Sequence, residues 1–228
     1  MGAAMLGISA CGLLSSDITK LTFPLPARTV QFDTASLNIP SGNTVAVPCG
    51  AGQLVMDCCN PPAPLPKPDC SAVNITCSAS SQGTNVCTAE VMVSQTTTVD
   101  LRQGDPRLAS ATSLANLSIS QISYSVDRNS LNIDLPPATI YLAPAGVMDG
   151  TDMRAKRFGT VPVIPAGTTP SGNVSLEPDA TSTFASFTHD LTMPFNLIVT
   201  ATVDVPSGTP IPTGAVQITV TGQLSASL

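Results

Sequence analysis

The sequence predicts a mainly β protein with the fold of an antiparallel β-sandwich, and three observations lead to this prediction. Segments in which apolar and polar residues alternate recur through most of the 228 residues, and a period of two is typical of strands with one buried face. These segments are separated by turns that use many of the 21 Pro and 16 Gly residues. Apolar residues make up 43% of the chain, which is ample for a core, whereas aromatic residues make up only 4%.

The N-terminal alternation predicts an edge strand over residues 21–33. Its apolar positions are Leu21, Phe23, Leu25, Val30 and Phe32. Pro24 and Pro26 lie among them, and proline, which has no N–H to donate, is confined within sheets mainly to edge strands. Leu37 and Ile39 continue the pattern, and residues 44–47 predict a further strand after a turn.

The rest of the chain predicts several short strands, one hairpin and two long closing strands. Alternation resumes in a strand at residues 88–94. Residues 117–135 predict a β-hairpin, because two alternating segments flank the turn Asp127–Ser130. Shorter strands are predicted at residues 139–142, 160–164 and 173–176, with a turn at 165–167. The closing strands, rich in Val, Ile and Thr, are predicted at residues 195–205 and 215–224.

One interval breaks the β pattern and predicts a short helix between Pro178 and Pro194. Its apolar residues recur at the spacing of one helix face: Phe184, Phe187 and Leu191. Asp179 or Thr181 can cap the start of this helix, and Pro194 ends it. We expect the two phenylalanines to cover one end of the sheet layers, where each would contribute about 2 kcal/mol by burial.

About nine short strands joined by Gly and Pro turns indicate a single sandwich domain over residues 21–228, with immunoglobulin-like layers. The C-terminal half, from about residue 114, is loosely similar to the sandwich domains of water-stress (late embryogenesis abundant type 2) proteins. No residue role is transferred from this similarity.

The apolar N-terminus contains the tetrapeptide Ile8-Ser9-Ala10-Cys11. It resembles the lipobox of bacterial lipoproteins, in which an aliphatic residue and two small residues precede the cysteine that receives the lipid. The resemblance implies a signal peptide, lipid attachment at Cys11 and, because Gly12 is not the Asp of inner-membrane retention, the outer membrane. The first basic residue is Lys20, so residues 1–20 are interpreted as a truncated signal and a tether. The alternative is a frayed terminus or a first strand.

The cysteine count agrees with export. Of seven cysteines, Cys11 is set aside for lipid, and the remaining six are Cys49, Cys58, Cys59, Cys70, Cys77 and Cys87. Six cysteines can pair in 15 ways, although the adjacent Cys58 and Cys59 are poor partners because neighbouring Cα atoms lie only about 3.8 Å apart. Disulfides imply an oxidising compartment. A metal site is the alternative, but there is no C-x-x-C pair.

These six cysteines fall within residues 48–87, a region that differs in kind from the rest. It contains the Pro-rich run 60–68, which favours extended polyproline geometry and cannot join the interior of a sheet. We interpret the region as a long loop excursion from the sandwich that is held together by disulfide bonds. It serves either to hold a long loop with little core of its own or to provide a binding surface.

Composition and motifs exclude several classes of function. The net charge of −6 disfavours a nucleic-acid partner. No nucleotide-binding, zinc-protease or nucleophile-elbow motif is present, and no cofactor is expected. The single histidine, His189, is followed by Asp190, which leaves a secreted hydrolase with a Ser-His-Asp set as an alternative. A surface histidine near a helix end is the simpler interpretation.

The one concentrated group of charges contains Asp149 and Asp152. These carboxylates are weak candidates for calcium binding, because the longer D-x-D-x-D-G spacing is missing, and a solvated loop is the simpler interpretation. The sequence therefore predicts a non-catalytic, lipid-anchored cell-envelope protein that acts as a structural or binding module. Its expected partners are the membrane and an envelope protein or glycan; a calcium- or carbohydrate-dependent adhesin is the remaining alternative.

Overall fold

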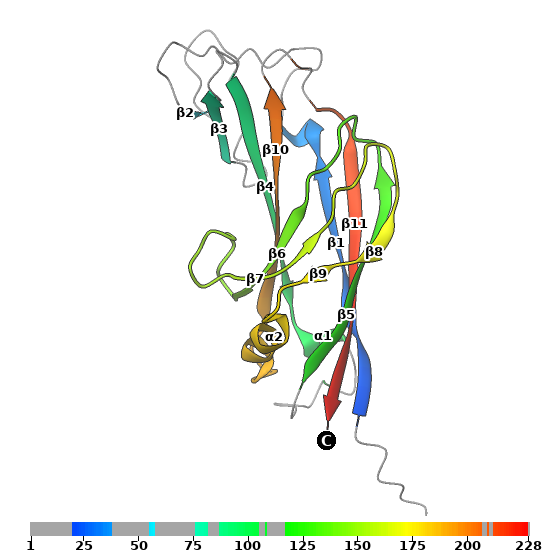
Figure 1. The fold of residues 1–228 in the computed structure, drawn as a ribbon. Coiled ribbons are helices and arrows are strands. Elements are labelled where there is room, and N and C mark those ends of the chain that lie inside the picture. The colour runs from blue at the N-terminus through cyan, green and yellow to red at the C-terminus, as the bar shows by residue number, and fades with distance from the viewer. Residues whose placement is uncertain are drawn as a thin grey trace, which may run out of the picture.

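The computed structural model describes residues 20–37, 55–57, 76–81, 87–104, 108, 117–206, 209 and 212–227. In this part of the chain, eleven strands form two antiparallel sheets that face each other as a sandwich (Figure 1). The prediction of a mainly β, antiparallel sandwich is confirmed, with more strands than the nine expected. The residues predicted to form a strand at 44–47, the position of Ile39 and the Pro-rich run 60–68 lie outside the described residues.

The smaller sheet has four strands in the order β1-β11-β5-β8. These are β1 (Lys20–Asp33), β11 (Ala215–Ser227), β5 (Ser118–Asn129) and β8 (Ser171–Asn173). The larger sheet has seven strands in the order β2-β3-β4-β10-β6-β7-β9. These are β2 (Val55–Asp57), β3 (Thr76–Ser81), β4 (Cys87–Val99), β10 (Phe195–Pro206), β6 (Ala138–Pro144), β7 (Lys156–Val161) and β9 (Ser175–Leu176).

Strand β1 is at the edge of its sheet, as its prolines predict. It pairs with β11 along almost its full length, with one irregularity between Leu25 and Arg28. On the outer side of this edge, the side-chain amide of Gln95 from β4 bonds both backbone groups of Gln31: its Oε1 accepts from the Gln31 N–H at 3.0 Å, and its Nε2 donates to the Gln31 carbonyl. This side chain therefore links the two sheets and covers part of the exposed edge.

The inner faces of the two sheets supply the core. Phe23 and Phe32 from β1 face the same layer as Ile140 and Leu142 from β6, and all four are buried. The alternation of apolar residues along each strand explains this arrangement, because successive side chains point to opposite faces of a sheet.

Helix α2 (Ala180–Thr188) closes one end of the sandwich, and its position confirms the predicted helix (Figure 1). Asp179 is the N-cap residue. The helix ends well before Pro194 because Asp190 forms a tight turn with Thr192: its Oδ1 accepts from the backbone N–H at 2.9 Å and from the hydroxyl at 2.6 Å. Phe184 is 1% exposed, whereas Phe187 is only half-buried.

Two further short helical segments lie at strand ends. The 3-10 helix η1 (Thr34–Leu37) follows β1, and α1 (Leu101–Gly104) follows β4. The first of these corrects the prediction that Leu37 continues the strand pattern. The chain turns there because the Thr34 N–H and hydroxyl both donate to the carbonyl of Gly214, at 3.0 and 2.9 Å.

The predicted hairpin over residues 117–135 is wrong. Strand β5 pairs with β11 and β8, and residues 131–135 do not pair back onto it. Leu135 instead forms an isolated antiparallel β-bridge with Ile164. Leu131 and Leu135 are nevertheless buried, and Asn132 and Asp134 between them are exposed. The alternation thus reflects one-sided burial of a segment that crosses between the sheets, not strand pairing with its neighbour in sequence.

Other strand boundaries shift by a few residues. The strand expected at 88–94 extends over Cys87–Val99, and the strand expected at 160–164 lies at Lys156–Val161. The turn at 165–167 is confirmed: Gly167 has a φ of 64°, a conformation that glycine adopts without steric cost. Of the helices in the described residues, none has the length and apolar character needed to span a membrane.

Candidate functional site

His189 and Asp190 lie directly after helix α2 but do not form a catalytic pair. The exposed imidazole donates from Nδ1 to the carbonyl of Ser186 at 2.7 Å. Asp190 is engaged by Thr192, and these hydrogen bonds lower the pKa of its carboxyl group. In a Ser-His-Asp set, by contrast, the carboxylate would accept the proton of Nδ1 and orient the ring. The backbone carbonyl of Ser186 takes that place here.

Asp149 and Asp152 lie in the loop between β6 and β7, which projects from the sandwich (Figure 1). Asp149 Oδ1 accepts from the N–H of Thr151 at 2.8 Å. Both carboxylate oxygens of Asp152 accept hydrogen bonds from Arg154. Oδ1 accepts from the backbone N–H of Arg154 at 2.9 Å and from its side-chain Nε at 3.0 Å, and Oδ2 accepts from its Nη2 at 2.7 Å. A calcium ion at Asp152 would therefore have to displace the guanidinium group. Among the described residues, no three His, Cys, Asp or Glu side chains are grouped as metal ligands.

This ion pair makes a measurable prediction about pH. The hydrogen bonds from Arg154 lower the pKa of Asp152 from 3.8 to about 2. A carboxylate whose pKa is lower in the folded state stabilises the fold above its unfolded pKa, and this effect is lost as the pH falls through about 2. We expect carboxyl NMR of the wild-type protein to titrate Asp152 near that value. Arg154→Gln should raise this pKa toward 3.8, because the guanidinium group is lost, but not fully, because the backbone N–H of residue 154 still donates to the carboxylate.

The control for this measurement is Arg157→Gln. Arg157 belongs to the same charged group, but it pairs with Glu177 at 2.8 Å instead of Asp152. Its replacement should leave the Asp152 titration unchanged. A normal Asp152 pKa in the wild-type protein would show that the pair with Arg154 is not formed in solution.

Most of the cysteine predictions concern residues that the structure does not describe. Cys11, Cys49, Cys58, Cys59 and Cys70 lie outside the described residues. The backbones of Cys77 and Cys87 are described, in β3 and β4, where Cys77 is opposite Val91 and Cys87 is opposite Ser81. This places the two cysteines four positions apart along the strands, about 13 Å at the usual strand rise. A disulfide needs Cα atoms within about 7 Å, so this register is incompatible with a direct Cys77–Cys87 bond.

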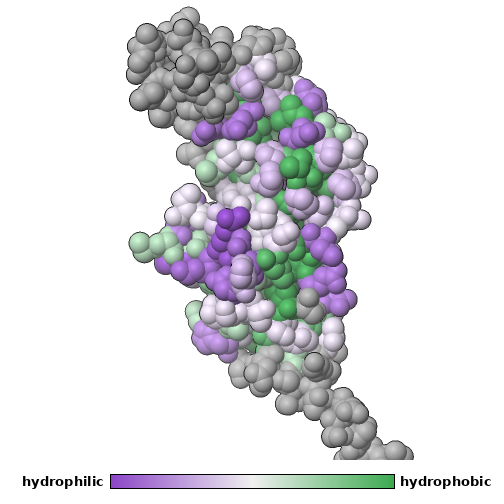
Figure 2. Space-filling view, in the orientation of Figure 1, coloured by the Kyte–Doolittle hydropathy of each residue, from purple (hydrophilic) through white to green (hydrophobic). Residues whose placement is uncertain are grey.

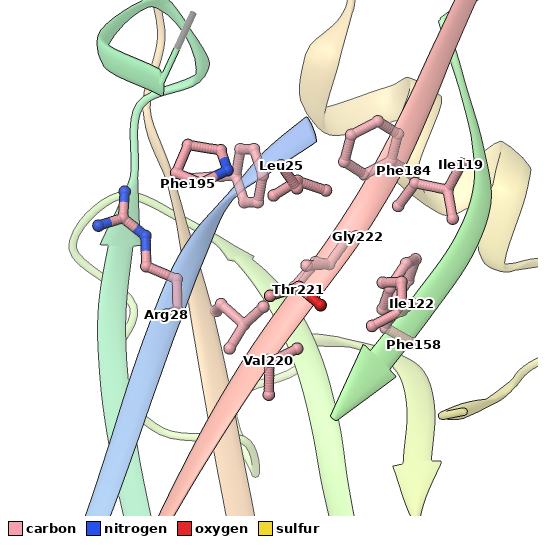
Figure 3. A pocket seen from close by; sticks show the side chains of 13 residues that line it. Leu25, Arg28, Ile119, Ile122, Phe158, Phe184, Phe195, Val220, Thr221 and Gly222 are labelled. Carbon is pink, nitrogen blue, oxygen red and sulfur yellow. The ribbon is translucent and has the colours of Figure 1, made fainter. Parts of the chain in front are cut away.

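A small hollow lies inside the sandwich, between the two sheets (Figure 3). Its walls are mainly aliphatic and aromatic side chains, among them Ile122, Phe158 and Phe184, and Arg28 lies at its rim. Its volume is about 20 Å³, which is room for a single water molecule. Ligand pockets usually measure about 300–1,000 Å³, so the hollow is a gap in core packing.

The candidate site is instead the outer face of the four-stranded sheet. Its outward side chains on all four strands are polar and uncharged over most of their extent, and we name this set the polar face. It consists of Thr22, Thr29, Gln31, Gln217, Thr219, Thr221, Gln223, Ser225, Ser118, Gln121, Ser123, Ser125, Ser171 and Asn173. In Figure 2, hydrophobic residues form a band down the middle of the view, with hydrophilic residues on either side.

The register of the sheet places similar polar residues opposite each other. Thr29 faces Thr219, and their hydroxyl oxygens are 3.2 Å apart. Ser225 faces Ser118, with their hydroxyl oxygens 2.9 Å apart. Such cross-strand hydrogen bonds stabilise the sheet and fix the positions of these short side chains. The polar face is therefore a pre-arranged set of donors and acceptors.

The centre of the polar face is a triad of Gln121, Ser123 and Asn173. Gln121 Nε2 donates to Asn173 Oδ1 at 2.7 Å and to Ser123 Oγ at 3.2 Å, and the Ser123 hydroxyl donates to the same Asn173 oxygen at 3.2 Å. Strands β5 and β8 bring the triad together across fifty residues of sequence, through the pairing of Ser123 with Asn173. The sequence does not predict this site, because the polar positions of the strand alternation are its only signal there.

The charged residues of this sheet lie away from the triad: Lys20 and Asp33 are at the two ends of β1, Arg28 lines the hollow between the sheets, and Asp127 and Arg128 are near the end of β5. Asp127 accepts from the hydroxyls of Ser125 at 3.1 Å and Thr219 at 2.5 Å, so its carboxylate is already engaged. Arg128 is exposed next to it. The one tyrosine on β5, Tyr124, points inward and is 6% exposed. The polar face thus offers hydrogen bonds without a stacking platform or a strong charge.

Comparisons with known proteins do not place the chain in a family. No family model matches it, and no similar sequence is found among curated proteins. Among solved structures, one similar chain comes from work on the promiscuous specificity of carbohydrate-binding modules of the β-sandwich superfamily. It is 9% identical, with a TM-score of 0.25 over 89% of the present chain and 54% of that chain. The present chain therefore spans about half the length of that structure, and a likeness of this size carries no argument about function.

Proposed function

We propose that this chain is a non-catalytic binding module of the bacterial cell envelope, anchored by a lipid at Cys11. The observation that carries the binding role is the polar face. It extends over the four strands of one sheet, and several of its side chains are ordered by hydrogen bonds to one another. The anchor is supported by the lipobox-like Ile8–Cys11 and by the even number of cysteines that remains.

The hydrogen bonds within the polar face favour binding at a low entropic cost. Ser, Thr and Asn side chains have few rotatable bonds, and several of them are already held by neighbours. A surface ordered before binding loses little conformational entropy when its ligand arrives. The two sheets share one core, so the strands that carry these groups form a rigid support.

The anchor is tested by expressing the chain from its own locus and separating membrane from soluble fractions. We expect the wild-type protein in the membrane fraction with a diacylglyceryl group on Cys11, identified by mass spectrometry. The Cys11→Ser variant should be found in the soluble fraction, because it has lost the acyl chains that bind the bilayer. An unmodified wild-type protein with free thiols in the cytosol would contradict the proposed anchor and compartment together.

The binding role is tested with the released Cys11→Ser protein. It should sediment with the insoluble envelope fraction of the same cells, and this binding should weaken when Gln121 and Asn173 in the polar face are both replaced by alanine. If the protein stays in the supernatant at all protein concentrations, the envelope-binding role is wrong.

A further inference from the structure

We infer that the polar face binds a neutral polysaccharide and that Gln121 and Asn173 are at the centre of the binding site. This inference rests on the proposed function, because it names the ligand of the same surface. It follows from three properties of the described residues: the hydrogen-bonding groups left open in the triad, the near absence of charge around the triad and the absence of aromatic rings there.

The triad has one amide NH2 group and one amide carbonyl group left for a ligand. Within the described residues, Nδ2 of Asn173 and Oε1 of Gln121 have no hydrogen-bond partner, and both side chains are exposed. A sugar hydroxyl both donates and accepts a hydrogen bond. The free amide N–H of Asn173 and the free amide carbonyl of Gln121 belong to side chains in direct contact on adjacent strands, and together they can bind two hydroxyl groups of a sugar chain.

The residue types of the polar face disfavour the other large partners that a cell envelope offers, which are charged polymers and proteins. The carboxylate of Asp127 is engaged by Ser125 and Thr219, and Arg128 is at the end of the face. Phosphate-rich or acidic polymers bind through clusters of Lys and Arg, and the polar face has no such cluster among its described residues. Protein interfaces are enriched in aromatic residues, Met and Arg at their core, and these are missing from the triad and its neighbours. A neutral, hydroxyl-rich polymer is complementary to this surface.

The absence of aromatic rings determines how the ligand is held. Each hydrogen bond exchanged with water contributes only about 1 kcal/mol net, so a single sugar would bind weakly. A polymer lying across several strands makes many such bonds at once, and linked contacts add without the full entropic cost of separate binding events. We therefore expect retention on long or insoluble chains and no measurable affinity for monosaccharides.

The test uses the full chain carrying Cys11→Ser, sedimented with insoluble cellulose, chitin and β-1,3-glucan. We expect retention on at least one of these polymers, and competition by its soluble oligosaccharides but not by the monosaccharide. The double replacement Gln121→Ala and Asn173→Ala should weaken retention about thirtyfold, since it removes two hydrogen bonds of about 1 kcal/mol each. The matched control replaces Thr139 and Thr202, on the outer side of the larger sheet, by alanine and should bind like the parent.

The outcomes separate this inference from the proposed function. Binding to the envelope fraction but to no neutral polysaccharide would overturn the inferred ligand and leave the envelope-binding role standing. Loss of envelope binding after protease treatment of that fraction would indicate a protein partner and also overturn the inference. Equal polymer binding by the double variant and its parent would show that the triad is not the site. In each variant, an unchanged circular dichroism spectrum and melting temperature show that the fold is intact.

Discussion

Gly214→Ala is expected to destabilise the protein by about 3–5 kcal/mol. Gly214 has a φ of 108°, and a Cβ atom there would lie 2.1 Å from the carbonyl oxygen of Ser130 and 2.9 Å from the N atom of Leu131. These are backbone atoms, which cannot rotate away as a side chain would. The same residue accepts two hydrogen bonds from Thr34, so a shift would also disturb the end of β1.

The control for this substitution is Gly146→Ala. Gly146 also has a positive φ, 93°, but a Cβ atom would have no neighbour within 4 Å. Alanine at this position should lower the free energy of unfolding by about 1–2 kcal/mol, which is the strain of a left-handed backbone conformation alone. Urea unfolding followed by circular dichroism measures both values. If the free energy of unfolding falls equally in the two variants, close contact with Ser130 is not the cause of the loss at Gly214.

Phe184→Ala is expected to lower the free energy of unfolding by about 3–5 kcal/mol, because it leaves a cavity at the end of the core. Phe184 is 1% exposed and lies between two other rings: its centroid is 6.4 Å from that of Phe158 and 6.1 Å from that of Phe195, in an edge-on arrangement with the latter. Its side chain also contributes to the wall of the small hollow between the sheets, which would enlarge when the ring is removed.

Phe187→Ala on the same helix provides the comparison. Phe187 is half-buried and is 6.2 Å from Phe195, its one aromatic neighbour among the described residues. Its replacement should cost clearly less than that of Phe184, as measured by the free energy of unfolding in urea. A larger loss at Phe187 would contradict the placement of helix α2 over the core.

The comparison of these two residues shows how far the sequence could predict the fold. The helical spacing of Phe184, Phe187 and Leu191 predicted the helix and its inward side. It could not distinguish the fully buried ring from the half-buried one, because that depends on β5, β6 and β7, which pack against the helix. The end of the helix was also missed, since the turn between Asp190 and Thr192 competes with further helical hydrogen bonds.

Residues 117–135 show the same limit for strand pairing. Alternation there correctly predicted which side chains are buried, but β5 pairs with β11, about a hundred residues further along the chain. Periodicity reports which face of a segment is apolar and contains no information about which segment lies beside it. The triad of Gln121, Ser123 and Asn173 was unpredictable for this reason, because it exists only once β5 and β8 are adjacent.

The side-chain amide of Gln95 protects the edge of β1 when many copies of the protein lie close together. The lipid anchor proposed above would confine the chain to a surface among many copies of itself, where a long strand edge such as that of β1 would be a template for further strands. An incoming strand would have to displace Gln95 from both backbone groups of Gln31. It would also meet Pro24 and Pro26, which have no N–H to offer. The sandwich can therefore be crowded on a surface without joining edge to edge, which leaves its polar face free for other partners.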